Sequence, residues 1–171
     1  MENDQLAGYL NDHLAGSVGA VELLEHLIST HEKEPVEHFC WELLAEVKAD
    51  QAELKAMMDA LDISEGAMRK AGAWITEKFS RAKLSLEGEG SLEQGLEALV
   101  LGITGKKLLW RALAAVQQDW PQLQSFDLAR LERRANEQID QTDAQRIAAA
   151  AKAFGKKKNQ TSQDGQAKGE R

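Results

Sequence analysis

The sequence has few prolines, few aromatic residues and a single cysteine. Its 171 residues include two prolines, Pro35 and Pro121, and aromatic residues make up 5% of the chain. Scarce proline and abundant Ala, Leu, Glu and Lys favour long helices, and no segment has the alternating pattern of a strand. The lone Cys40 excludes an internal disulfide. These absences predict an all-α fold.

Long apolar runs and a signal-like start are absent as well. The most apolar segment is interrupted at Gly102, Thr104 and Gly105, so no run approaches the roughly 20 residues that cross a bilayer. The start Met-Glu-Asn-Asp has neither the basic nor the apolar part of a signal peptide. We therefore expect a cytoplasmic protein without a membrane span.

Positive charge is in deficit. The chain has 21 Lys and Arg against 28 Asp and Glu, a net charge of -7. Nucleic acid and anionic membranes would repel such a surface on average, so neither is an expected partner. The length suits one domain.

Apolar residues recur at three- and four-residue steps, which predicts a series of helices. The four long ones are expected over 4–30, 35–61, 91–120 and 125–154. Pro35 suits a first helical turn, and a further helix is expected in the crossover segment 64–86. The pattern predicts an antiparallel four-helix bundle with an additional crossover helix over 1–154, followed by a disordered tail over 155–171.

Polar residues interrupt two of the apolar stripes. Asp50 falls in the stripe that contains Val47 and Leu54, and Lys106 falls in the stripe that contains Ile103 and Trp110. Opposite charges that share one layer offset much of the cost of burial. The spacing therefore predicts an internal ion pair between Asp50 and Lys106.

Two further polar residues are expected at the same depth. Counting back from the predicted turns places Ser17 and Gln138 level with the ion pair, which predicts a core polar layer of Ser17, Asp50, Lys106 and Gln138. In the alternative interpretation, Leu101 and Leu108 point inward and Lys106 extends to solvent. Further along, Arg146 counts as level with Glu97, either as a second ion pair or as a solvated rim arginine.

The layout resembles the ferritin-like superfamily of bacterioferritin and rubrerythrin type. Leu10-Asn11-Asp12-His13-Leu14 resembles the opening of the first helix in that family, and Glu46 through Leu54 resembles the second. The resemblance implies a di-iron or di-manganese carboxylate centre at mid-bundle. Carried over, the first metal glutamate falls on Ser17, and the Glu-x-x-His motif falls on Val47 and Asp50. Because these positions depart from the family, the resemblance implies a degenerate metal site.

One alternative keeps a metal. The family's third-helix glutamate corresponds to Glu97, and its second Glu-x-x-His corresponds to Glu137-Gln138-Ile139-Asp140. A histidine-free site for iron or manganese would then use Asp50, Glu97, Glu137 and Asp140. Such a protein would be a di-metal oxidase or an iron-storage or stress protein.

Other candidate groups are expected to be structural. His26, His31 and His38 gather with glutamates near the first predicted turn, where a solvated surface is expected rather than a metal site. Cys40 is expected to be a packed small residue. The four tryptophans are expected at or beside the core: Trp41, Trp74, Trp110 and Trp120.

The function expected from these patterns is non-catalytic. An internal ion pair takes the place of the metals, no cofactor is expected, and the bundle is expected to bind a protein partner or to form a homo-oligomer. The di-metal carboxylate protein described above is the alternative.

Overall fold

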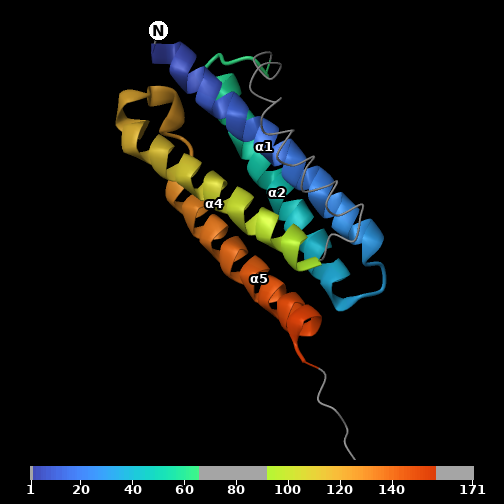
Figure 1. Cartoon of the computed structure of the whole chain (residues 1–171). Helices are drawn as coiled ribbons and strands as arrows, with labels where there is room; N and C mark the ends of the chain where they lie inside the picture. Colours follow the sequence, from blue (N-terminus) through green and yellow to red (C-terminus); the bar gives the residue numbers. More distant parts are fainter. Residues whose placement is uncertain (1, 66–91, 157–171) are drawn as a thin grey trace, which may run out of the picture.

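The computed structural model describes residues 2–65 and 92–156, and every regular element in these ranges is helical (Figure 1). The four long helices are α1 Glu2–Thr30, α2 Pro35–Ala60, α4 Leu92–Val116 and α5 Leu128–Phe154. The all-α prediction is confirmed for the described ranges. The expected crossover helix, including Trp74, and the tail from residue 157 onward lie outside them.

A tight turn joins α1 to α2. Lys33 adopts a positive φ of 68°, and its backbone N–H donates to a carboxylate oxygen of Glu37 at 2.7 Å. Pro35 then occupies the first turn of α2, where its missing N–H costs no hydrogen bond. The second helix therefore begins where the sequence predicts.

The connection from α4 to α5 departs from the prediction. α4 ends at Val116, and two 3-10 turns follow, η2 Gln117–Asp119 and η3 Pro121–Leu123. Trp120 is extended because the next residue is a proline. The side chain of Gln117 donates to the carbonyls of Leu123 and Phe126 at 2.9 and 3.0 Å, which holds the loop. Asp127 caps α5 by accepting from the backbone N–H of Arg130 at 2.8 Å.

The four helices pack as a bundle around one apolar core. α1 lies beside α2 and α4 beside α5 (Figure 1), and α1 also packs on α4. Gly95 marks the α1–α4 contact, because a Cβ at this position would lie 2.9 Å from Leu27 Cδ2. Leu24, Leu99 and Leu131 are among the fully buried side chains.

The rotation of α4 decides between the two sequence interpretations. Leu101 and Leu108 are 67% and 52% exposed, whereas Ile103 and Trp110 are buried. The interpretation that turns both leucines inward is therefore wrong. The expectation for Trp41 is also wrong: it lies on the outer face of α2 and is 53% exposed, while Trp110 is buried as expected.

No helix in the described ranges combines the length and the apolar character that a transmembrane span requires.

Candidate functional site

The most unusual interior group is the carboxylate of Asp50. Asp50 lies near the middle of α2 and is 2% exposed, with Val47 and Leu54 buried one turn away on either side. A buried carboxylate costs several kcal/mol unless it is paired and hydrogen-bonded. Its partners therefore determine what this site is.

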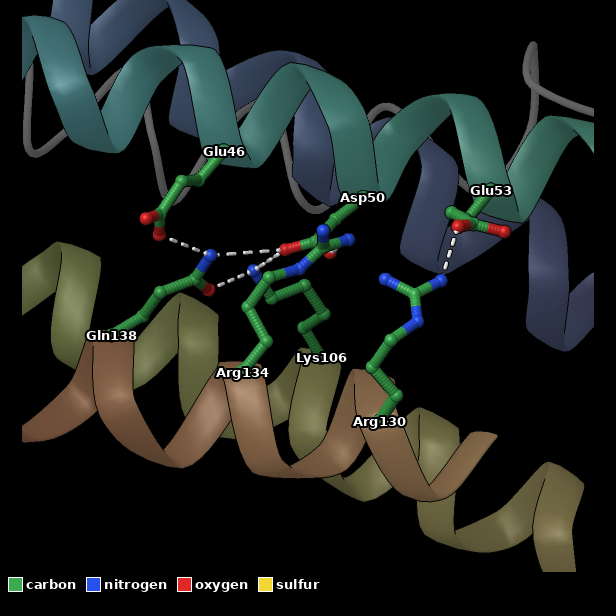
Figure 2. A network of polar contacts seen from close by, with 7 residues as sticks. All are labelled: Glu46, Asp50, Glu53, Lys106, Arg130, Arg134 and Gln138. Carbon is green, nitrogen blue, oxygen red and sulfur yellow. Dashed lines mark hydrogen bonds and ion pairs between the residues drawn. The ribbon is translucent and has the colours of Figure 1, made fainter. Parts of the chain in front are cut away.

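Three side chains from two other helices contact Asp50 (Figure 2). Lys106 of α4 donates to Oδ2, Arg134 of α5 donates to Oδ1, and Gln138 of α5 donates to Oδ2 at 3.2 Å. One carboxylate thus receives donors from two cations and an amide. We call Asp50, Lys106, Arg134 and Gln138 the Asp50 cluster.

Gln138 links the cluster to a second carboxylate. Its Oε1 accepts from Lys106 Nζ, and its Nε2 donates to Asp50 and, at 2.9 Å, to Glu46 Oε2. The hydroxyl of Thr142 donates to the backbone carbonyl of Gln138 at 2.6 Å. The Gln138 amide is 1% exposed, and both its oxygen and its nitrogen are hydrogen-bonded, as buried polar groups usually are. Its oxygen faces the Lys106 ammonium and its nitrogen faces the two carboxylates.

The cluster belongs to a longer row of polar contacts between α2 and α5. Glu46 pairs with Gln138, Asp50 with Arg134, and Glu53 with Arg130 at 2.6 Å, so numbers rise along α2 as they fall along α5 (Figure 2). α2 supplies every carboxylate and α5 every donor. We call these three pairs the α2–α5 polar seam.

The two helical hairpins also differ in overall charge, and the acidic one is the hairpin that contains α2. Residues 2–65 contain fifteen Asp and Glu and three Lys and Arg, whereas residues 92–156 contain eight and nine. In each ion pair found between these halves, the carboxylate comes from the first and the cation from the second; the pairs are Asp50–Lys106, Asp50–Arg134, Glu53–Arg130 and Glu34–Lys152. The two halves are therefore electrostatically complementary.

Burial opposes the positive charge of Lys106. Desolvation lowers the pKa of its ammonium, while the Asp50 carboxylate acts in the opposite direction. Lys106 keeps 16% of its side chain exposed and Arg134 keeps 24%. The interior contact with Asp50 is what compensates for holding an ammonium at this depth.

The structure brings three of the four residues of the expected polar layer together. Ser17 lies elsewhere: its hydroxyl donates to the carbonyl of Leu14 at 2.6 Å and accepts from Gln51 Nε2 at 2.8 Å. The level of Ser17 along the bundle is close to the prediction, but its partner is the residue after Asp50. Ser17 therefore lies at the expected depth but outside the contacts of Asp50, because Gln51, one residue on, projects toward α1.

Sequence reasoning missed Arg134 and Glu46. Arg134 precedes Gln138 by four residues, and Glu46 precedes Asp50 by four, so each lies one helical turn from a residue that was identified. Long side chains such as these reach the interior from the edge of a helix. The missed signal was the four-residue spacing on facing helices.

The structure does not bring the alternative metal set of Asp50, Glu97, Glu137 and Asp140 together, since Asp50 is buried at mid-bundle and the other three lie on the surface. Glu97, Glu137 and Asp140 are exposed, and no group of three potential metal ligands converges within the described ranges. The donor set at mid-bundle does not fit a divalent metal either, because Lys106 and Arg134 place positive charge there. An iron or manganese ion would have to displace both.

Edge charges and histidines form separate contacts. Glu25 of α1 pairs with Lys48 of α2 at 3.1 Å, at the exposed edge between the two helices. Arg146 contacts Asp143 at 2.7 Å and lies 3.8 Å from Glu97, so its main partner is on its own helix. His31 pairs with Glu34 within the turn.

Cys40 is unsuited to nucleophilic chemistry. It is fully buried on α2, and burial raises the pKa of its thiol to about 11. Since the thiolate is the reactive form, the side chain is a packed neutral group near neutral pH.

Comparison with known proteins adds no relative. No protein-family model, curated protein or solved structure matches the chain.

Proposed function

We propose that this protein is a non-catalytic, ferritin-like antiparallel bundle that acts by binding a protein, a second copy of itself included. In this proposal the Asp50 cluster takes the place of a metal centre. The observation that carries it is the buried Asp50 carboxylate with two cationic partners.

The chemistry of the cluster supports this interpretation. A dinuclear site of the ferritin-like kind gathers several carboxylates around two cations that are metal ions. Here Lys106 and Arg134 supply positive charge and Asp50 supplies the negative charge that balances part of it. The Gln138 amide fills the remaining hydrogen bonds, which leaves Asp50 without a vacant oxygen for a metal.

The cluster also has a structural consequence that suits a binding scaffold. Asp50 joins α2 to both α4 and α5, so the contacts hold two helical hairpins in one register. Buried polar groups fix one arrangement among alternatives in some helical assemblies. We infer that the Asp50 cluster keeps the outer faces of the bundle in a constant relative position.

Metal analysis tests the proposal. The full chain is incubated aerobically with Fe(II) or Mn(II), separated from free metal, and analysed for bound metal and for a shift in Tm. We expect well below one ion per chain and an unchanged Tm. A content of about two ions per chain, lost on Asp50→Asn but retained in the control Asp59→Asn, would overturn the proposal.

A further inference from the structure

The outer face of α4 carries an apolar stripe with no partner in the described chain. Leu101 and Leu108 are 67% and 52% exposed and lie two turns apart, so they share one face. α4 packs against α1 and α5, and this face points away from the core that Ile103 and Trp110 enter.

The residues at the centre of the stripe are small, and their polar group is already hydrogen-bonded. The midpoint between Leu101 and Leu108 falls between Thr104 and Gly105. A Cβ at Gly105 would have no atom within 4 Å, and the Thr104 hydroxyl donates to the carbonyl of Val100 at 2.8 Å. An approaching helix would therefore meet little bulk and no unsatisfied hydroxyl.

Opposite charges flank the stripe at nearly equal distances from its midpoint. Glu97 lies about two turns to one side and Arg111 about two turns to the other, and both are mostly exposed, at 64% and 59%. Their intramolecular contacts are loose, 3.8 Å to Arg146 and 3.6 Å to Glu132. Both charges are thus available for another partner.

We propose that two copies of the chain associate through this face, with their α4 helices antiparallel across a twofold axis near Thr104 and Gly105. The inference rests on the proposed function and names the second copy as the partner. An antiparallel pair places Leu101 of each copy level with Leu108 of the other and brings Glu97 near Arg111. Self-complementarity of this kind is what an isologous interface requires.

Sedimentation of the full chain tests the association. We expect a dimer at about 10 to 100 µM that dissociates on dilution. Replacing Leu101 and Leu108 together with glutamine should raise the Kd at least about 100-fold, because four leucines leave the interface. The control Trp41→Gln removes an equally exposed apolar group from α2 and should change the Kd less than about threefold. A wild-type monomer throughout, or equal effects of both changes, would overturn the proposal.

A charge exchange tests the orientation. Glu97→Lys alone should weaken the dimer, and adding Arg111→Glu in the same chain should restore it, because each exchanged pair meets again across the axis. Thr104→Cys should form a cross-linked dimer on oxidation, whereas Ala52→Cys on α2 should not. Failure of both the restoration and the cross-link would contradict the antiparallel geometry. A metal-free monomer would refute this inference alone, and a metal-loaded dimer would refute the proposed function alone.

Discussion

Replacing Asp50 with asparagine tests the energetic role of the cluster. The change keeps the shape of the side chain and removes its charge, so Lys106 and Arg134 lose the carboxylate that both contact. Breaking a buried ion pair from one side costs about 3 to 5 kcal/mol. Because these two side chains remain 16% and 24% exposed and can turn toward water, we expect a loss near the lower end, about 3 kcal/mol.

Urea denaturation followed by tryptophan fluorescence and by far-UV circular dichroism measures this loss. Asp59→Asn is the matched control, since Asp59 lies on the exposed face of the same helix and should change the free energy of unfolding by less than about 0.5 kcal/mol. Lys106→Met completes a double-mutant cycle, in which we expect a coupling energy of at least about 1 kcal/mol with Asp50. A loss below about 1 kcal/mol for Asp50→Asn, or no coupling, would refute the reasoning.

Three smaller predictions concern other positions. Burial raises the pKa of the Cys40 thiol from 9.0 to about 11, so the folded state holds this proton more tightly than the unfolded state does. The stability that the neutral thiol contributes is full below pH 9 and should be lost as the pH rises toward 11. Unfolding curves measured against pH should show this loss, and Cys40→Ala should abolish it. Arg130→Gln breaks the pair with Glu53, whose side chain is 30% exposed, while that of Arg130 is 44% exposed, so water screens the pair. The free energy of unfolding should therefore fall by less than about 1 kcal/mol, and a larger fall would mean that the seam acts as a cooperative unit. In the dilute, monomeric protein Gly105→Ala should raise stability by about 0.5 to 1 kcal/mol, since no atom of the same chain lies within 4 Å of its Cβ. Gly95→Ala must move Leu27 and should gain less; thermal melts of the monomer that reverse this order would contradict the packing of α1 on α4.

The positions of the helices follow largely from local rules. Apolar spacing and Pro35 predicted the bounds of α2 and α5 to within a few residues. The end of α4 was missed because the 3-10 turns depend on the side chain of Gln117 reaching two loop carbonyls, and this contact is not visible in a periodic pattern.

The centre of the site was predicted better than its surroundings. Asp50 and Lys106 stand out because each is a single charge within an apolar stripe, and level counting was enough to add Gln138. Arg134 reaches Asp50 from the edge of its helix, and the rotation that brings it there depends on the packing of all four helices. Ser17 shows the limit of level counting, since the level along the bundle does not fix which neighbour a short side chain meets.

The most direct test is to crystallise the protein with Mn(II) and to record anomalous diffraction near the manganese absorption edge. The measurement shows whether the Asp50 cluster or a metal ion occupies the middle of the bundle. We predict density for Lys106 and Arg134 in contact with Asp50 and no anomalous peak at mid-bundle. An anomalous peak bound to Asp50, with Lys106 turned away, would show that the interior is a metal centre and would contradict the account.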